Sequence, residues 1–156
     1  MQHDQNFDGV YDVQHQKKLS RAISLIENQS PGYEEILSSL QPKNVPVIGI
    51  TGPPGAGKST LTNALLKEMV DQQKAVAVLC VDPSSPFNLG SLLGDRIRMA
   101  DWYNHPNVFI RSLASRGSLG GLHPAIIEIT ELLKSSFFDY IIIETIGVGQ
   151  SEVEIA

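Results

Sequence analysis

The clearest chemical signature lies at residues 52–59, which read Gly-Pro-Pro-Gly-Ala-Gly-Lys-Ser and match G-x-x-x-x-G-K-[ST] at every position. Glycines let successive backbone N–H groups turn toward one phosphate, and the amino terminus of a following helix adds partial positive charge. Lys58 is suited to the β- and γ-phosphates, Ser59 to Mg²⁺ and Thr60 to the α-phosphate. We therefore predict a phosphate-binding loop formed by Gly52, Pro53, Pro54, Gly55, Ala56, Gly57, Lys58, Ser59 and Thr60.

Two carboxylates follow apolar runs further along the chain. Asp82 comes after Ala75–Val81, and Glu144 comes after Tyr140–Ile143. Ligands of open α/β sheets bind at the carboxyl ends of the strands, so each acid is a candidate for Mg²⁺ or its water. Asp82 has the alternative role of capping the turn that follows it. Glu144 directly follows three isoleucines, where a charge is costly unless it is compensated. Three residues further on, we predict that Gly147 N–H contacts the γ-phosphate.

Short apolar runs alternate with segments of helical periodicity. The pattern predicts an α/β fold with a mostly parallel sheet, helices on both of its faces and a short helical extension in front. Helices are expected at Gln16–Asn28, from Ser30-Pro31 to Leu40, and at Lys58–Val70, Leu92–Tyr103 and Pro124–Lys134. Strands are expected at Val45–Ile50, Ala75–Val81, Asn107–Leu113 and Tyr140–Ile143.

Composition narrows the class of protein further. Of the 156 residues, 42% are hydrophobic and 19% charged, which excludes disorder over the whole length. The apolar runs are too short for a membrane helix. The net charge of −5 argues against sequence-independent binding of nucleic acid or anionic membranes. Cys80 is the single cysteine, so no internal disulfide can form, which fits a cytoplasmic protein.

The acidic segment at residues 144–147 reads Glu-x-x-Gly where most GTPases have Asp-x-x-Gly. This resembles the metallochaperone GTPases that serve nickel, cobalt and cobalamin enzymes. One branch of that family, the MeaB/ArgK/MMAA type, chaperones adenosylcobalamin-dependent methylmalonyl-CoA mutase. The chain is similar to that branch from about Val45 to Ala156, and more loosely over the helices from Gln16 to Leu40. The segments that carry the likeness are residues 81–87, 94–99, 115–121 and 144–152.

The resemblance implies a P-loop GTPase that takes GTP and Mg²⁺ and assists cobalamin loading and protection of the mutase. Residues 1–44 would be the tail and helical extension, and residues 45–156 an incomplete G domain whose carboxyl-terminal part is missing. The implied metal-binding residues are Ser59, Asp82, Asp95 and Glu144, and the implied catalytic residues are Lys58, Glu144 and Gln150. Gln150 would orient the attacking water, with an ordinary switch or partner-facing glutamine as the alternative. Pro83–Met99 would form switch I and Gly147–Glu152 would open switch II.

The sequence alone leaves other classes of P-loop protein open. An ATP-dependent small-molecule kinase, a transport-linked ATPase and a nucleotide-binding scaffold can all use the same loop. GTP rather than ATP follows from the resemblance, because the guanine-reading Asn-Lys-x-Asp segment would lie after Ala156. The resemblance also implies that the whole protein is a homodimer. The 156-residue segment alone should expose an unpaired sheet edge, dissolve poorly and bind guanine nucleotide weakly.

Several other polar residues have no assigned chemistry. Arg96, Arg98, Arg111 and Arg116 are candidates for switch salt bridges or partner contacts, or are solvated, and none is assigned as an arginine finger. Trp102 is expected to pack, with partner contact as the alternative, and His123-Pro124 is expected to begin a helix.

Overall fold

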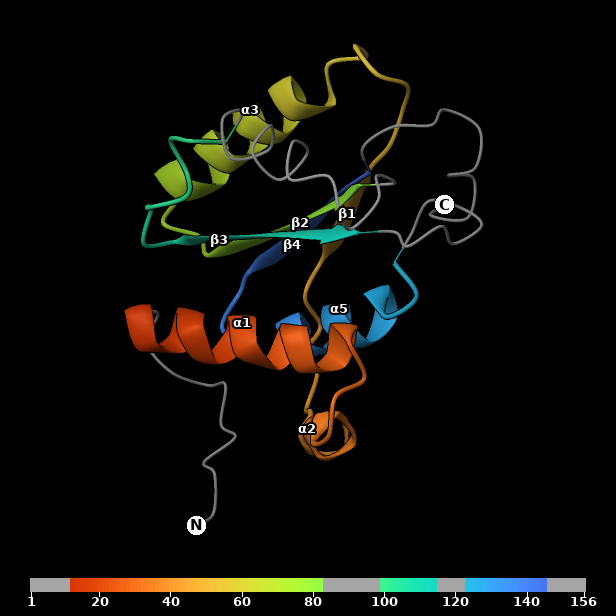
Figure 1. Cartoon of the computed structure of the whole chain (residues 1–156). Coiled ribbons are helices and arrows are strands. Elements are labelled where there is room, and N and C mark those ends of the chain that lie inside the picture. The colour runs from red at the N-terminus through yellow and green to blue at the C-terminus, as the bar shows by residue number, and fades with distance from the viewer. Residues whose placement is uncertain (1–11, 83–98, 115–122, 146–156) are drawn as a thin grey trace.

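The computed structural model describes residues 12–82, 99–114 and 123–145 (Figure 1). Its centre is a sheet of four strands in the order β1-β4-β2-β3, and every neighbouring pair is parallel. The strands are β1 (Val47–Ile50), β2 (Val76–Asp82), β3 (Val108–Ala114) and β4 (Tyr140–Thr145). All four predicted strands are therefore present, and the predicted α/β fold with a parallel sheet is confirmed.

Helices cover both faces of this sheet. The helix α3 (Lys58–Asp71) lies on one face, while α1 (Val13–Glu27) and α5 (Ile126–Lys134) lie on the other (Figure 1). The short helix α2 (Tyr33–Ser39) packs against the layer formed by α1. Within the described residues, no helix is long and apolar enough to cross a membrane.

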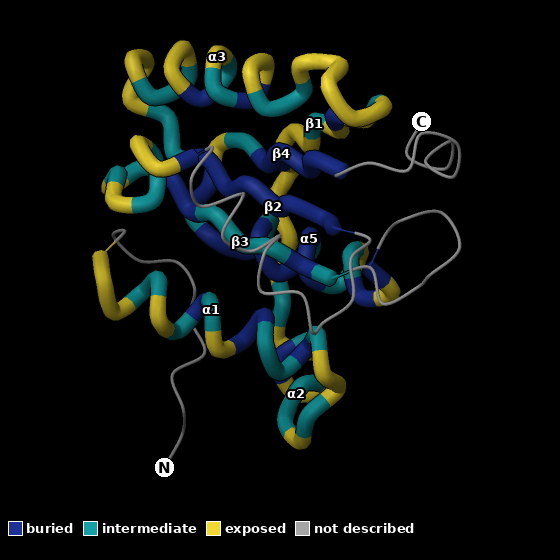
Figure 2. Tube along the Cα trace, turned by 45° about the horizontal axis from the view of Figure 1, so that its top comes forward, coloured by how far each residue is buried: buried dark blue, intermediate teal, exposed yellow. Residues whose placement is uncertain are grey.

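The side chains of β2 alternate between two apolar cores, one on each face of the sheet. All seven β2 residues are buried (Figure 2). Ala77, Leu79 and Val81 join the core shared with α1 and α5, and Val76, Val78 and Cys80 join the core beneath α3. A strand buried on both faces is typical of parallel sheets, which explains why β2 reads as one continuous apolar run.

The helical extension packs directly on the sheet. α1 buries Leu19, Ala22, Ile23 and Ile26 in the same core as β2, β3 and β4. Arg111, on β3, donates from Nη2 to Ser24 Oγ at 2.9 Å and to Glu27 Oε2 at 3.2 Å. Arg111 therefore ties α1 to the sheet and is not a solvated residue.

Helix starts differ from the sequence-based expectations in two places. α2 begins at Tyr33 rather than at Ser30-Pro31, because Ser30 N–H bonds to Leu25 O at 2.9 Å and Gly32, at φ 98°, turns the chain into the helix. α5 begins at Ile126 rather than at His123-Pro124. There His123 Nδ1 accepts the Ala125 N–H at 3.0 Å, which closes a turn before the helix.

The end of the expected helix Leu92–Tyr103 is misplaced, because its last five residues, 99–103, are not helical. Residues 99–104 form consecutive turns, with Trp102 N–H bonded to Met99 O at 2.9 Å and His105 N–H bonded to Trp102 O at 3.0 Å. Residues 92–98 lie outside the described ranges. Trp102 packs in the core beneath α3 and donates to Asn63 Oδ1 at 3.1 Å, so the turns are anchored to that helix.

β1 forms one side of the sheet in the described part of the chain. It pairs there with β4 alone, and Val47 is 41% exposed. Beside it on the α5 face, Val47, Ile126, Ile127 and Ile143 line an apolar groove. Among the described residues β1 is therefore one edge strand of the sheet, and β3 is the other.

Candidate nucleotide-binding site

The loop between β1 and α3 has the backbone shape that its glycines suggest. Gly55 and Gly57 adopt φ values of 79° and 92°, in the left-handed region that favours glycine. Gly57 is the N-cap of α3 and supplies no side chain to cap it. The first amides of α3 have no partner within the helix, so they are available to an anion at the mouth of the loop.

Lys58 folds back over this loop. Its Nζ donates to Gly52 O at 2.6 Å and to Pro53 O at 3.1 Å. The ammonium group therefore stands at the loop mouth, held by carbonyl oxygens that a phosphate oxygen can replace as acceptor. Pro53, Pro54, Gly55, Ala56, Gly57 and Thr60 are exposed on the loop and the first turn of α3.

Glu144 is the buried acid of the site. β4 runs two residues further than predicted, so Glu144 lies within the strand, opposite Ile50 of β1 and next to the start of the loop. Its side chain is 2% exposed. Ser59 Oγ donates to Oε1 at 2.9 Å, and Thr62 Oγ1 lies 2.7 Å from Oε2. These hydroxyls supply the compensation that a charge in this position requires.

Asp82 lies at the same edge of the sheet. It is the last residue of β2, and Cys80, two residues earlier, is in register with Glu144. Asp82 is 9% exposed. At the same edge, Thr145 Oγ1 of β4 donates to Thr51 Oγ1 at 3.0 Å. Thr51 is the residue just before the loop. The two predicted acids are therefore on neighbouring strands, facing the end of the sheet from which the loop departs.

The oxygen donors at this edge suit Mg²⁺. Mg²⁺ prefers oxygen ligands and usually takes one or two carboxylates together with substrate phosphates and water. The Ser59 hydroxyl and the Glu144 carboxylate meet at the base of the loop. In the described ranges there is no group of three or more His, Cys, Asp or Glu side chains that could hold a metal ion. One hydroxyl and one carboxylate are the kind of ligand set that Mg²⁺ shares with nucleotide phosphates and water.

Some predicted residues cannot be placed, and two polar residues were missed. Asp95, Gly147 and Gln150 lie outside the described residues. Thr51 and Thr62 were not predicted, although both make hydroxyl contacts at the site. The available signal for Thr62 was its spacing, because a residue three positions after Ser59 lies on the same helical face.

The sheet is parallel, and a glycine-rich loop leads from it into a helix, with a lysine at the loop mouth and a buried acid at the loop base. These features define a P-loop nucleotide-binding protein. The family model described as methylmalonyl-CoA mutase-associated GTPase MeaB matches residues 19–156. The chain belongs to this family.

Relatives agree with this assignment. A protein of Pyrococcus abyssi named "Putative GTPase" is 49% identical over 138 residues, covering 87% of this chain and 43% of the relative. GTPase ArgK of Escherichia coli is 40% identical over 144 residues, which are 88% of this chain and 44% of the relative. The chain therefore spans less than half the length of these relatives. It is also 41% identical over 146 residues to the fused isobutyryl-CoA mutase of Cupriavidus metallidurans, covering 89% of this chain and 13% of that protein.

Proposed function

We propose that the protein binds GTP with Mg²⁺ at this loop and hydrolyses the bond to the γ-phosphate. The observation that carries the proposal is the 2.9 Å hydrogen bond from Ser59 to buried Glu144, which joins the P-loop hydroxyl to the acid of a neighbouring strand. GTP rather than ATP is supported by the family description and by the names of the relatives.

The chain's own residues have separate roles in this proposal. The glycine-shaped loop and the first turn of α3 bind the phosphates through backbone N–H groups. Lys58 exchanges the carbonyls of Gly52 and Pro53 for phosphate oxygens and stabilises the charge that develops during in-line attack by water. Ser59 and Glu144, with Asp82 and Asp95, would hold Mg²⁺ or its waters. When bound, Mg²⁺ neutralises phosphate charge.

Two further roles rest on the sequence and on the family resemblance, because both residues lie outside the described ranges. Gly147 would donate its N–H to the γ-phosphate, and Gln150 would orient the attacking water. Both follow Glu144 closely in the sequence.

The proposed partner is a cobalamin-dependent mutase. The family description names methylmalonyl-CoA mutase, and a sequence like this one lies within the fused isobutyryl-CoA mutase. We propose that the whole protein, as a cytoplasmic homodimer, couples GTP hydrolysis to cobalamin loading and protection of such a mutase.

A partner should accelerate hydrolysis. The arginines in the described ranges are Arg21, in α1, and Arg111, which contacts α1 on the face of the sheet opposite α3. Neither is placed to act as an arginine finger at the loop, and Arg96, Arg98 and Arg116 lie outside the described residues. From the mutase named in the family description we expect slow GTP turnover by the full-length protein, and acceleration of at least about ten-fold by the mutase of the same organism.

Phosphate release measured with and without that mutase tests the expectation. A cobalamin-independent protein added at the same concentration is the control. Equal rates with and without the mutase would count against the proposed partner.

A further inference from the structure

Thr62 makes an unusual contact with the acid of the site. It lies one turn after Ser59 in α3, is fully buried, and places Oγ1 2.7 Å from Glu144 Oε2. Ser59 contacts the other oxygen, Oε1, at 2.9 Å. Two successive turns of one helix therefore hold the two oxygens of a single carboxylate.

The proton of the Thr62 hydroxyl has two acceptors within reach. Oγ1 also lies 3.0 Å from Lys58 O, the usual bond of a threonine to its own helix. The carboxylate is nearer and charged, and O–H···O⁻ bonds are shorter and stronger than bonds to a neutral carbonyl. The Thr62 proton is therefore directed to Glu144.

The contact fixes which carboxylate oxygen faces the loop. Glu144 is 2% exposed, so water has little access to Oε2 in place of a hydroxyl. With Oε2 held by Thr62, Oε1 stays on Ser59, which lies in the first turn of α3 directly after the phosphate-binding loop. A valine at position 62 would fill the same space and leave Oε2 without this donor.

We propose that Thr62 is a positioning residue for Glu144, and that its hydroxyl tunes the Mg²⁺ requirement of nucleotide binding. This inference rests on the proposed function, because it takes Glu144 to hold Mg²⁺ or its water. In this proposal Thr62 acts through the Glu144 carboxylate that it contacts.

The test is the Mg²⁺ concentration that half-maximally slows release of a fluorescent GTP analogue from the full-length protein. Thr62→Val should raise this concentration by about ten-fold, the effect of one hydrogen bond to a charged group. Thr62→Ser, which keeps the hydroxyl, should stay within about two-fold of wild type. Should the valine variant fail to fold, Thr62→Ala gives the same comparison.

Thr130→Val is a matched control. Thr130 is also buried on a helix, but its hydroxyl donates to Ile126 O at 2.6 Å within α5. This variant should leave the Mg²⁺ midpoint unchanged. The Thr62→Val effect should also disappear in a Glu144→Gln background, because the two groups act as a unit.

The outcomes separate this inference from the proposed function. If Glu144→Gln raises the Mg²⁺ midpoint and Thr62→Val does not, Thr62 has no positioning role while the metal site stands. If Thr62→Ser is as impaired as Thr62→Val, packing rather than the hydroxyl matters and the inference is overturned. If Glu144→Gln leaves the midpoint unchanged, the metal assignment fails and the inference fails with it.

Discussion

Replacing Lys58 by alanine is expected to lower GTP hydrolysis by about 100-fold or more, and to weaken nucleotide binding. The ammonium group is the positive charge held at the loop mouth, on Gly52 O and Pro53 O. Removing one preorganised group that stabilises developing charge typically lowers kcat by a factor of about 10²–10³. Phosphate release and equilibrium titration with a fluorescent GTP analogue measure the two effects.

Lys67→Ala is the matched control for this variant. Lys67 is also in α3, but its side chain is 72% exposed and forms an i,i+4 pair with Asp71 at 2.7 Å. An exposed pair of this kind contributes little to stability. Hydrolysis by Lys67→Ala should therefore remain near wild type. A Lys58→Ala protein with wild-type affinity and turnover would rule out the loop as the nucleotide site.

Glu144→Gln is expected to lower hydrolysis by about 100-fold and to raise the Mg²⁺ concentration that half-saturates the reaction. Glutamine keeps the shape of the side chain. One of the two hydroxyls, of Ser59 or Thr62, can still donate to its amide oxygen, while the other accepts from its amide nitrogen. The variant therefore removes the negative charge while the packing around the side chain is kept. Loss of one charged contact to the metal accounts for the altered Mg²⁺ dependence. Steady-state hydrolysis across a Mg²⁺ series measures both quantities.

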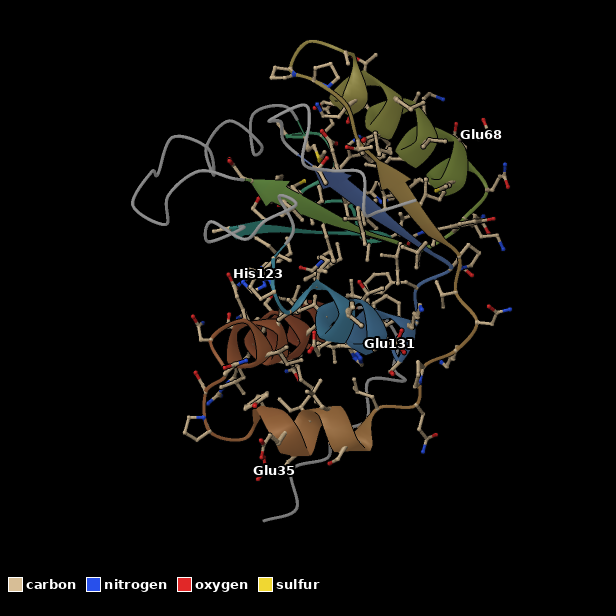
Figure 3. The ribbon with its side chains drawn as sticks, turned by 90° about the vertical axis from the view of Figure 1, so that its right-hand side faces the viewer. Glu35, Glu68, His123 and Glu131 are labelled. Atoms are coloured by element: carbon tan, nitrogen blue, oxygen red, sulfur yellow. The ribbon has the colours of Figure 1, made fainter. Side chains whose placement is uncertain are left out.

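Glu68→Gln controls for the loss of an acid near the same helix. Glu68 lies on the outer side of α3, where Figure 3 labels it, and its Oε1 accepts from Gln72 Nε2 at 2.8 Å. Figure 3 also shows Glu131 on α5, on the other side of the sheet. Neither acid is near the loop. If Glu68→Gln and Glu144→Gln had the same effect, the loss would reflect overall charge rather than the site.

The parts of the site that could be predicted are those set by local chemistry. The loop from Gly52 to Ser59 needs glycines, a lysine and a hydroxyl at fixed spacing, so its position is readable from the chain alone. Glu144 was predictable because a carboxylate directly after a run of isoleucines is costly to bury unless partners compensate its charge. Such a residue is therefore a candidate for a functional site. The sheet was predictable because strands buried on both faces are apolar without interruption.

The parts that were missed depend on contacts between segments far apart in the sequence. In the sequence Thr62 looks like an ordinary helical residue. Its contact with Glu144 arises because β4 packs beside α3, which only the structure shows. From sequence alone Arg111 is a candidate for a switch salt bridge or a partner contact, or is solvated. In the structure α1 packs on the sheet and brings Glu27 to it. The start of α2 was misplaced because Ser30 closes the end of the preceding helix instead of capping the next one.

Mg²⁺-dependent phosphate release from GTP by the full-length protein tests the central claim most directly. ATP at the same concentration and GTP with excess EDTA are run beside it. The proposed function predicts release from GTP with Mg²⁺, markedly slower release from ATP, and none above background in EDTA. Equal release in EDTA would contradict a Mg²⁺ site built on Lys58, Ser59 and Glu144. A preference for ATP would contradict GTP as the substrate, which rests on the family description and the names of the relatives.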